Sequence, residues 1–289
     1  MKKIKTIKNA GFCYGVERAY NLAVKELNNT ENTVYSLGDL IHNKQVVEEL
    51  NELGARPIKE LSEIKKNKAS IIIRAHGISK EVNKKINEKN LNIVDATCPF
   101  VKVPQNAVKE YGNKGYFIFI AGDENHPEVE GIKSYVQESQ RMIINNANKL
   151  HQISFTYPKK ATLVSQTTMS FEIFSKIALF LMSKIEELVV INSICDATNI
   201  RQKETRELAQ KSDIIIVIGG RHSANTKRLF QIAGEYTEAI QIETEFELEK
   251  KWFKNKENIG ITAGASTPNW IIERVENKIK DFFKGEIYE

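Results

Sequence analysis

Three cysteines are the residues of this chain whose type and spacing best suit chemistry. They are Cys13, Cys98 and Cys195, at intervals of 85 and 97 positions. An odd number cannot all pair in disulfides, and no CxxC spacing of a zinc ribbon or thioredoxin is present. Each interval approaches one third of the 289 residues. The spacing therefore predicts a threefold organisation.

Other polar residues follow each cysteine at similar distances and divide the chain into three blocks. The blocks are Cys13, His42, His76; Cys98, His126, Thr167; and Cys195, Ser223, Ser266. Recurrence at similar intervals is typical of repeated structural units. We expect three pseudo-equivalent α/β units, formed by residues 14–97, by residues 98–193, and by residues 1–13 together with 194–289.

Hydrophobic periodicity predicts strands that alternate with helices along the chain. Apolar β-branched runs predict strands at residues 3–7, 33–37, 70–74, 92–96, 116–121, 141–144, 162–165, 189–194, 213–218, 239–242 and 259–262. Helical spacing is found at residues 16–27, 45–53, 80–89, 101–111, 128–136, 171–188, 201–211, 226–236 and 270–283. This alternation predicts mostly parallel sheets, in which ligands bind at the carboxyl ends of strands beside helix N-termini.

The polar residues of the blocks all lie near predicted junctions between a strand and a helix. If three units pack around a common axis, three thiolates converge at the centre. Such a set suits a metal centre with an open coordination position, either zinc with a water ligand or a cubane iron–sulfur cluster with one iron lacking a cysteine. Sulfur ligands do not decide between the two. The alternative for each cysteine is a small buried apolar residue.

A second group of residues offers hydrogen-bond donors suited to an anion. His42, His126, Ser223, Asn225 and Ser266 fall at predicted helix N-termini, where a phosphate or diphosphate binds favourably. Each serine, and Asn225, also has a simpler explanation as a helix cap. The convergence of five such residues favours an anion site.

Glu128 is the carboxylate placed best for proton transfer, because it lies two residues after His126 in a junction motif. A carboxylate in a metal pocket donates protons when its pKa is raised there. Its presence in a first helical turn is also favourable on electrostatic grounds alone. Thr167, at the next junction, is a candidate hydroxyl relay.

Composition restricts the class of protein. The chain is 41% hydrophobic and 27% charged, with 42 Lys and Arg against 37 Asp and Glu, which is typical of a globular protein. The net charge of +5 comes from lysines scattered over amphipathic segments, so we expect no nucleic-acid partner. No apolar run reaches the length of a membrane span and no secretory signal begins the chain, so we expect a cytoplasmic protein without a membrane partner.

Several motifs resemble those of the 4-hydroxy-3-methylbut-2-enyl diphosphate reductase family from the first strand to the last helix. They are Gly11-Phe12-Cys13-Tyr14-Gly15-Val16, Arg74-Ala75-His76-Gly77, Asp95-Ala96-Thr97-Cys98-Pro99, His126-Pro127-Glu128-Val129-Glu130-Gly131, Ser165-Gln166-Thr167-Thr168 and Thr262-Ala263-Gly264-Ala265-Ser266-Thr267-Pro268. The chain departs from the family at Ala224, where the family usually has Ser or Gly. We therefore assign Ala224 no side-chain hydrogen bond.

The resemblance implies a trefoil-like arrangement of the three units around one [4Fe-4S] cluster, held by Cys13, Cys98 and Cys195 with one iron open. It implies that Glu128 and Thr167 are catalytic. It further implies that the substrate diphosphate is bound by His42, His76, His126, Ser223, Asn225 and Ser266.

The implied reaction converts the allylic alcohol to isopentenyl diphosphate and dimethylallyl diphosphate with two electrons, two protons and loss of water. It is the last step of the non-mevalonate isoprenoid route. No flavin or nicotinamide motif is visible, so a ferredoxin or flavodoxin is the expected electron donor. Two alternatives are a non-redox iron–sulfur hydratase or isomerase acting on a small anion, and a zinc-stabilised binding protein.

Overall fold

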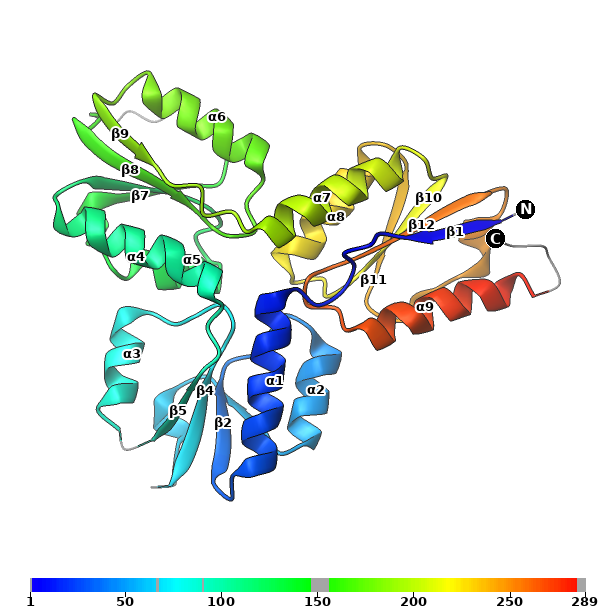
Figure 1. Ribbon diagram of the computed structural model, residues 1–289, viewed down its shortest axis with the longest axis horizontal. Coiled ribbons are helices and arrows are strands. Elements are labelled where there is room, and N and C mark those ends of the chain that lie inside the picture. The colour runs from blue at the N-terminus through cyan, green and yellow to red at the C-terminus, as the bar shows by residue number, and fades with distance from the viewer. Residues whose placement is uncertain (1, 66–67, 90, 147–155, 285–289) are drawn as a thin grey trace. The chain divides into compact units, whose positions relative to one another are not determined.

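The computed structural model describes residues 2–65, 68–89, 91–146 and 156–284, which form three four-stranded sheets (Figure 1). Every strand pairing within these sheets is parallel. Each sheet is covered by helices, as connections between parallel strands require. The prediction of three α/β units with parallel sheets is confirmed.

The first sheet has the strand order β1-β12-β10-β11. Its strands are β1 (Lys3–Thr6), β10 (Ile214–Ile218), β11 (Glu238–Ile242) and β12 (Asn258–Ala263). Ile214, Ile216 and Ile218 pack against α9 (Asn269–Phe282), whereas Ile215 and Val217 pack against α7 (Asp196–Ala209) and α8 (Ala224–Gly234). Because alternate residues of a strand face opposite sides, β10 is apolar throughout and buried on both faces.

The second sheet has the strand order β3-β2-β4-β5. Its strands are β2 (Thr33–Leu37), β3 (Arg56–Ile58), β4 (Ala69–Ile73) and β5 (Asn92–Asp95). Ile71 and Ile73 of β4 pack with Ile86 of α3 (Lys80–Asn87). From the neighbouring position of β4, the Ser70 hydroxyl donates to Glu26 of α1 (Tyr14–Asn29) over 2.5 Å. Helix α2 (Lys44–Glu52) connects β2 to β3.

The third sheet has the strand order β7-β6-β8-β9. Its strands are β6 (Phe117–Ala121), β7 (Arg141–Ile144), β8 (Lys160–Ser165) and β9 (Glu187–Val190). Helices α4 (Pro99–Asn113) and α5 (Pro127–Lys133) cover one face, and α6 (Phe171–Met182) covers the other (Figure 1). Short 3-10 helices connect elements of the three sheets at Leu61–Glu63, Glu138–Gln140, Glu245–Glu247 and Lys250–Phe253.

The chain forms two compact units. Unit 1 comprises Met1–Glu17, Ile41–Glu49 and Asp196–Glu289, and unit 2 comprises Arg18–Leu40 and Leu50–Cys195. Unit 1 contains the first sheet, and unit 2 contains the second and third sheets. The boundaries of the three predicted units, at residues 14, 98 and 194, remain a prediction.

Several element predictions need correction. Strand β3 (Arg56–Ile58) was not predicted because it has three residues and contains Pro57. The helix predicted over residues 171–188 ends at Met182, since Ser183 caps it and β9 begins at Glu187. Helix α7 begins at Asp196 rather than residue 201, because polar residues occupy the buried face of its first turns and hide the apolar period.

No helix within the described ranges is both long enough and apolar enough to cross a membrane.

Candidate functional site

The nine residues that make up the three sequence blocks each lie between a strand and the helix that follows it. In chain order, the connections are β1 to α1, β2 to α2, β4 to α3, β5 to α4, β6 to α5, β8 to α6, β9 to α7, β10 to α8 and β12 to α9. In all three sheets the strand that precedes the cysteine, β1, β5 or β9, is an edge strand. Corresponding residues therefore occupy the same place in each sheet.

Each cysteine lies directly before the first residue of a helix. Cys13 precedes α1, Cys98 is the N-cap residue of α4, and Cys195 precedes α7. All three are half-buried thiols outside disulfides. Since a helix N-terminus favours negative charge, this position suits a thiolate ligand.

The backbone of each cysteine is fixed by the loop that follows the neighbouring strand. The amide of Cys13 donates to Ala265 O over 3.2 Å, that of Cys98 to Ala75 O over 3.0 Å, and that of Cys195 to Thr167 O over 3.0 Å. The same hydrogen bond thus recurs between β1 and β12, β5 and β4, and β9 and β8. Three thiols presented in the same way fit a metal centre with soft sulfur ligands. Cys13 belongs to unit 1, and Cys98 and Cys195 belong to unit 2.

Unit 2 contains a buried carboxylate, Glu128 of α5, which contacts Thr167 in the loop after β8. Glu128, which is 2% exposed, accepts a hydrogen bond at Oε1 from the backbone N–H of Thr167 over 2.7 Å. Its Oε2 accepts another from the Thr167 hydroxyl over 2.9 Å. The structure therefore pairs the two residues predicted to be catalytic.

The pKa of Glu128 is raised to about 7 because burial removes water from the charged carboxylate. The two hydrogen bonds from Thr167 act in the opposite direction, since they stabilise the charged form. A carboxyl group with a pKa near 7 is protonated often enough to act as an acid and ionises easily enough to release the proton. The arrangement suits proton donation to a bound ligand.

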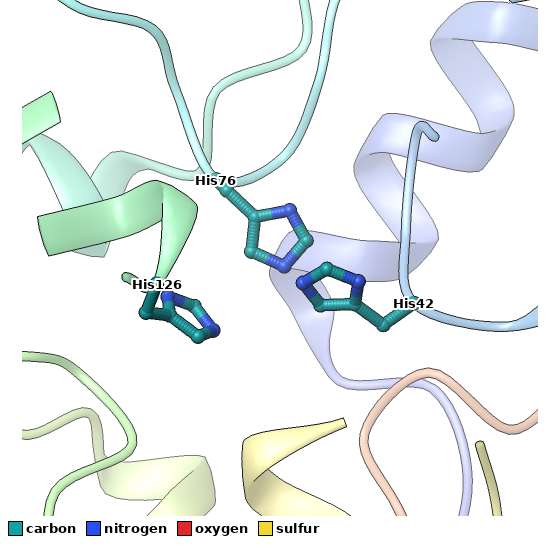
Figure 2. A group of neighbouring side chains, drawn as sticks. All are labelled: His42, His76 and His126. Carbon is teal, nitrogen blue, oxygen red and sulfur yellow. The ribbon is translucent and has the colours of Figure 1, made fainter. Parts of the chain in front are cut away.

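Two histidines of unit 2, His76 and His126, lie close to each other (Figure 2). The rings of His76 and His126 meet edge to face, with centroids 5.6 Å apart, and one nitrogen of each lies within 4.8 Å of the other. His126 caps α5, because its Nδ1 accepts from the backbone N–H of Glu128 over 3.2 Å. Because Nδ1 accepts that bond, the proton of the neutral His126 ring is on Nε2.

Unit 1 brings together three loops at the carboxyl ends of its strands. The hydroxyl of Ser266 donates to His42 O over 3.1 Å. Gly220 lies against the same carbonyl, and a Cβ atom there would be 2.8 Å from His42 O. These contacts place the loops that contain His42, Gly220 and Ser266 side by side. Only a residue without a side chain allows the approach at position 220.

Asn225 is a buried polar residue of unit 1. It lies in the first turn of α8 and is 5% exposed, and neither its Oδ1 nor its Nδ2 has a hydrogen-bond partner among the described residues. Ser223 caps the same helix by accepting from Thr226 N over 3.3 Å, which leaves its hydroxyl hydrogen available. A buried amide without a partner is costly unless a ligand satisfies it. The geometry suits an anion bound at the start of α8.

Sequence reasoning missed two contributors to these loops. Gly220 was not singled out, although a Gly219-Gly220 pair directly after a buried strand indicates a close backbone approach. Arg201, which donates to Asn9 O and Gly11 O in the loop before Cys13, lies inside the predicted helical pattern of residues 201–211 and belongs to no motif. An arginine on the buried face of an amphipathic helix was the available signal.

Comparison with known proteins assigns the chain to a family. The family model described as "LytB protein" matches residues 4–280. The 4-hydroxy-3-methylbut-2-enyl diphosphate reductase of Clostridioides difficile is 44% identical over 272 residues, covering 94% of this chain and 97% of that protein. The reductase of the same name from Campylobacter hominis is 45% identical over 279 residues, covering 96% and 98%.

Solved structures agree with the sequence matches. A structure of (E)-4-hydroxy-3-methyl-but-2-enyl diphosphate reductase, described as the terminal enzyme of the non-mevalonate pathway, has 38% identity and a TM-score of 0.71, covering 97% of this chain and 100% of that one. The E-1-hydroxy-2-methyl-but-2-enyl-4-diphosphate reductase from Plasmodium falciparum has 30% identity and a TM-score of 0.89, covering 96% and 87%. With matches that span almost its whole length, the chain belongs to the LytB protein family.

Proposed function

We propose that this protein is an oxidoreductase that removes the hydroxyl group of 4-hydroxy-3-methylbut-2-enyl diphosphate. The substrate takes up two electrons and two protons, its allylic C–O bond breaks, and water leaves. A new C–H bond at one end or the other of the allylic system gives isopentenyl diphosphate or dimethylallyl diphosphate. The observation that carries this proposal is the buried Glu128 carboxyl, which Thr167 orients and whose pKa is raised to about 7.

Cys13, Cys98 and Cys195 would hold a [4Fe-4S] cluster. Their common position before a helix, and their identical backbone hydrogen bonds, support a shared role. A cluster with three cysteine ligands supplies electrons and, at its fourth iron, a Lewis acid for the substrate oxygen when it is bound.

Glu128 would provide the proton that lets the hydroxyl group leave as water. With its pKa raised to about 7 by burial, its carboxyl can hold and release a proton near neutral pH, as a general acid must. Thr167 donates to both carboxyl oxygens, which fixes the orientation of the carboxyl group and stabilises the anion that remains. Thr167 is thus a hydroxyl in contact with the acid, as a relay requires.

The diphosphate would be bound by His42, His76, His126, Ser223, Asn225 and Ser266. Imidazole N–H, hydroxyl and amide groups all donate to phosphate oxygens. The unsatisfied Asn225 amide and the unused hydrogen of Ser223 support this assignment. The Ser266 hydroxyl already donates to His42 O, so a phosphate would have to draw it away from that carbonyl.

Electrons would come from a reduced ferredoxin or flavodoxin in the cytoplasm. Such donors are commonly acidic, and the net charge of +5 with a pI near 8.8 favours association with an acidic protein. We propose no nucleic-acid partner and no membrane partner.

Anaerobic purification followed by a turnover assay tests the proposed function. We expect a brown protein with iron and sulfide in equal amounts, about four of each per chain, that converts the allylic diphosphate when dithionite is the reductant. Zinc in place of iron would support the binding-protein alternative. An iron–sulfur protein that consumes substrate without any reductant would support the hydratase or isomerase.

A further inference from the structure

Helix α7 has an unusual polar stripe on its buried face. Residues at the spacing i, i+3, i+4 and i+7 of a helix share one face. In α7 this face carries Thr198, Arg201, Gln202 and Thr205, all at most 7% exposed, before it becomes apolar at Leu208 and Ala209. A helix that packs on a core normally presents an apolar stripe. The first turns of α7 therefore make polar contacts that serve something other than core packing.

Arg201 makes the most extensive of these contacts. Its side chain is 3% exposed, and its Nε and Nη2 donate to Asn9 O and Gly11 O, each over 2.9 Å. Its Nη1 donates to Ala197 O over 3.3 Å. One planar guanidinium thus joins the first turn of α7 to the segment that leads to Cys13.

The same segment is constrained from its other sides. Gly11 has a φ of 92°, and a Cβ there would lie 2.5 Å from Asn269 Oδ1 of α9. Glu204, one turn after Arg201, accepts from Asn9 N over 2.9 Å and from Asn9 Nδ2 over 2.6 Å at the surface. Gly11 is two residues before Cys13. Contacts that fix residues 9–11 therefore restrict the position of the Cys13 thiol.

We propose that Arg201 is a positioning residue for Cys13, through which α7 fixes the loop and stabilises a cluster held there. This inference rests on the proposed function. Burying a guanidinium is expensive, so a site that needs only packing would carry an apolar residue. Arginine is required because three carbonyl groups are bridged by one rigid fork, which the single ammonium of a lysine cannot do. The buried positive charge also favours the more reduced, more negative state of a bound cluster.

Three variants separate this role from general stability. Arg201→Lys keeps the positive charge but loses the planar guanidinium donors, and Arg201→Met loses both the charge and the donors. Glu204→Gln is the matched control, because its contact to the same Asn9 is exposed and water can replace it at little cost. Circular dichroism melting establishes that each full-length variant is folded.

Loss of iron to a chelator and the reduction potential of the loaded protein are the first readouts. We expect the chelator to remove iron about 10-fold faster from Arg201→Lys, as for other residues that orient metal ligands. Arg201→Met should lose iron at least as fast and have a more negative reduction potential than the wild type. Glu204→Gln should stay near the wild-type rate and potential.

Hydrogen exchange in the protein without cluster is the second readout, and it does not depend on the proposed function. The Cys13 amide, which donates to Ala265 O, should exchange faster in Arg201→Lys, whereas the Cys98 amide should not change. Unchanged Cys13 exchange and iron loss in a folded Arg201→Lys protein would overturn the positioning role. A wild-type chain that binds no iron would instead overturn the cluster assignment, leaving the exchange result to decide whether Arg201 fixes the loop.

Discussion

The two compact units carry candidate site residues with different chemistry. Unit 2 carries two cysteines, the paired rings of His76 and His126, and a buried carboxyl with a pKa near 7. Unit 1 carries one cysteine, His42 and the neutral donors Ser223, Asn225 and Ser266. The acid belongs to unit 2, and the Ser223, Asn225 and Ser266 donors belong to unit 1.

A physical reason favours this division. A proton donor must titrate near the working pH, which requires a carboxyl removed from water. Hydroxyl and amide groups do not titrate in this range, so they bind an anion equally well on either side of pH 7. Substitution of Glu128 in unit 2 and of Asn225 in unit 1 should therefore affect different properties.

The largest loss of activity is expected at the cysteines, which both units carry as proposed iron ligands. Replacement of Cys13, Cys98 or Cys195 by serine should strip the iron from the protein, because a hydroxyl is a poor ligand for iron in place of a thiolate. Iron and sulfide content and the absorption spectrum after anaerobic purification measure this loss. Full loading of Cys195→Ser would refute the scheme of three ligands.

Glu128→Gln should separate proton transfer from binding in unit 2. Glutamine keeps the shape and can still accept from Thr167 N, but it cannot donate a proton as an acid. We expect kcat to fall about 10²- to 10⁴-fold while the cluster spectrum stays unchanged. Glu130→Gln is the control, since this exposed glutamate of the same helix pairs with Lys133. Wild-type turnover in Glu128→Gln would exclude the carboxyl as the acid.

The pH dependence of stability should reveal the buried carboxyl of unit 2 directly. Its folded-state pKa of about 7 lies above the ordinary value of 4.5, so the folded state binds the proton more tightly than the unfolded chain. Protonation of Glu128 therefore adds about 3 kcal/mol to the free energy of unfolding. This contribution is complete below about pH 4.5 and is lost as the pH rises through about 7. Chemical denaturation of the wild type and Glu128→Gln across this range measures it. Parallel curves for the two proteins would show that Glu128 has an ordinary pKa.

Asn225→Leu should have the smallest effect on activity, and it tests whether unit 1 donates to the diphosphate. Because the buried amide has no partner among the described residues, an apolar side chain of similar size should leave the unliganded protein as stable or more stable. Loss of a donor to the diphosphate should raise KM about 10-fold, the effect of one such hydrogen bond, with little change in kcat. Thermal melting and steady-state kinetics test both parts, with the exposed Gln231→Ala of the same helix as control. A large fall in kcat at constant KM would place Asn225 in the chemical step instead.

The strand pattern was predictable because β-branched apolar runs such as Ile214–Ile218 are buried on both faces of a parallel sheet. The start of α7 was not predictable from periodicity, since Thr198 and Arg201 occupy positions where apolar residues mark a buried face. Strand β3 was missed because three residues with a proline carry too little pattern.

The sequence by itself determined which side chains stand at the ends of parallel strands, because alternating strands and helices leave those junctions as the place for polar residues. It thereby supplied the three thiols, the candidate acid and the candidate anion donors. Only the tertiary structure showed that Thr167 donates to both oxygens of Glu128 and that Arg201 connects α7 to the loop before Cys13. It also showed that the Asn225 amide is buried and has no partner among the described residues. These facts depend on contacts between segments 39 to 192 residues apart and on burial, which local sequence patterns do not encode.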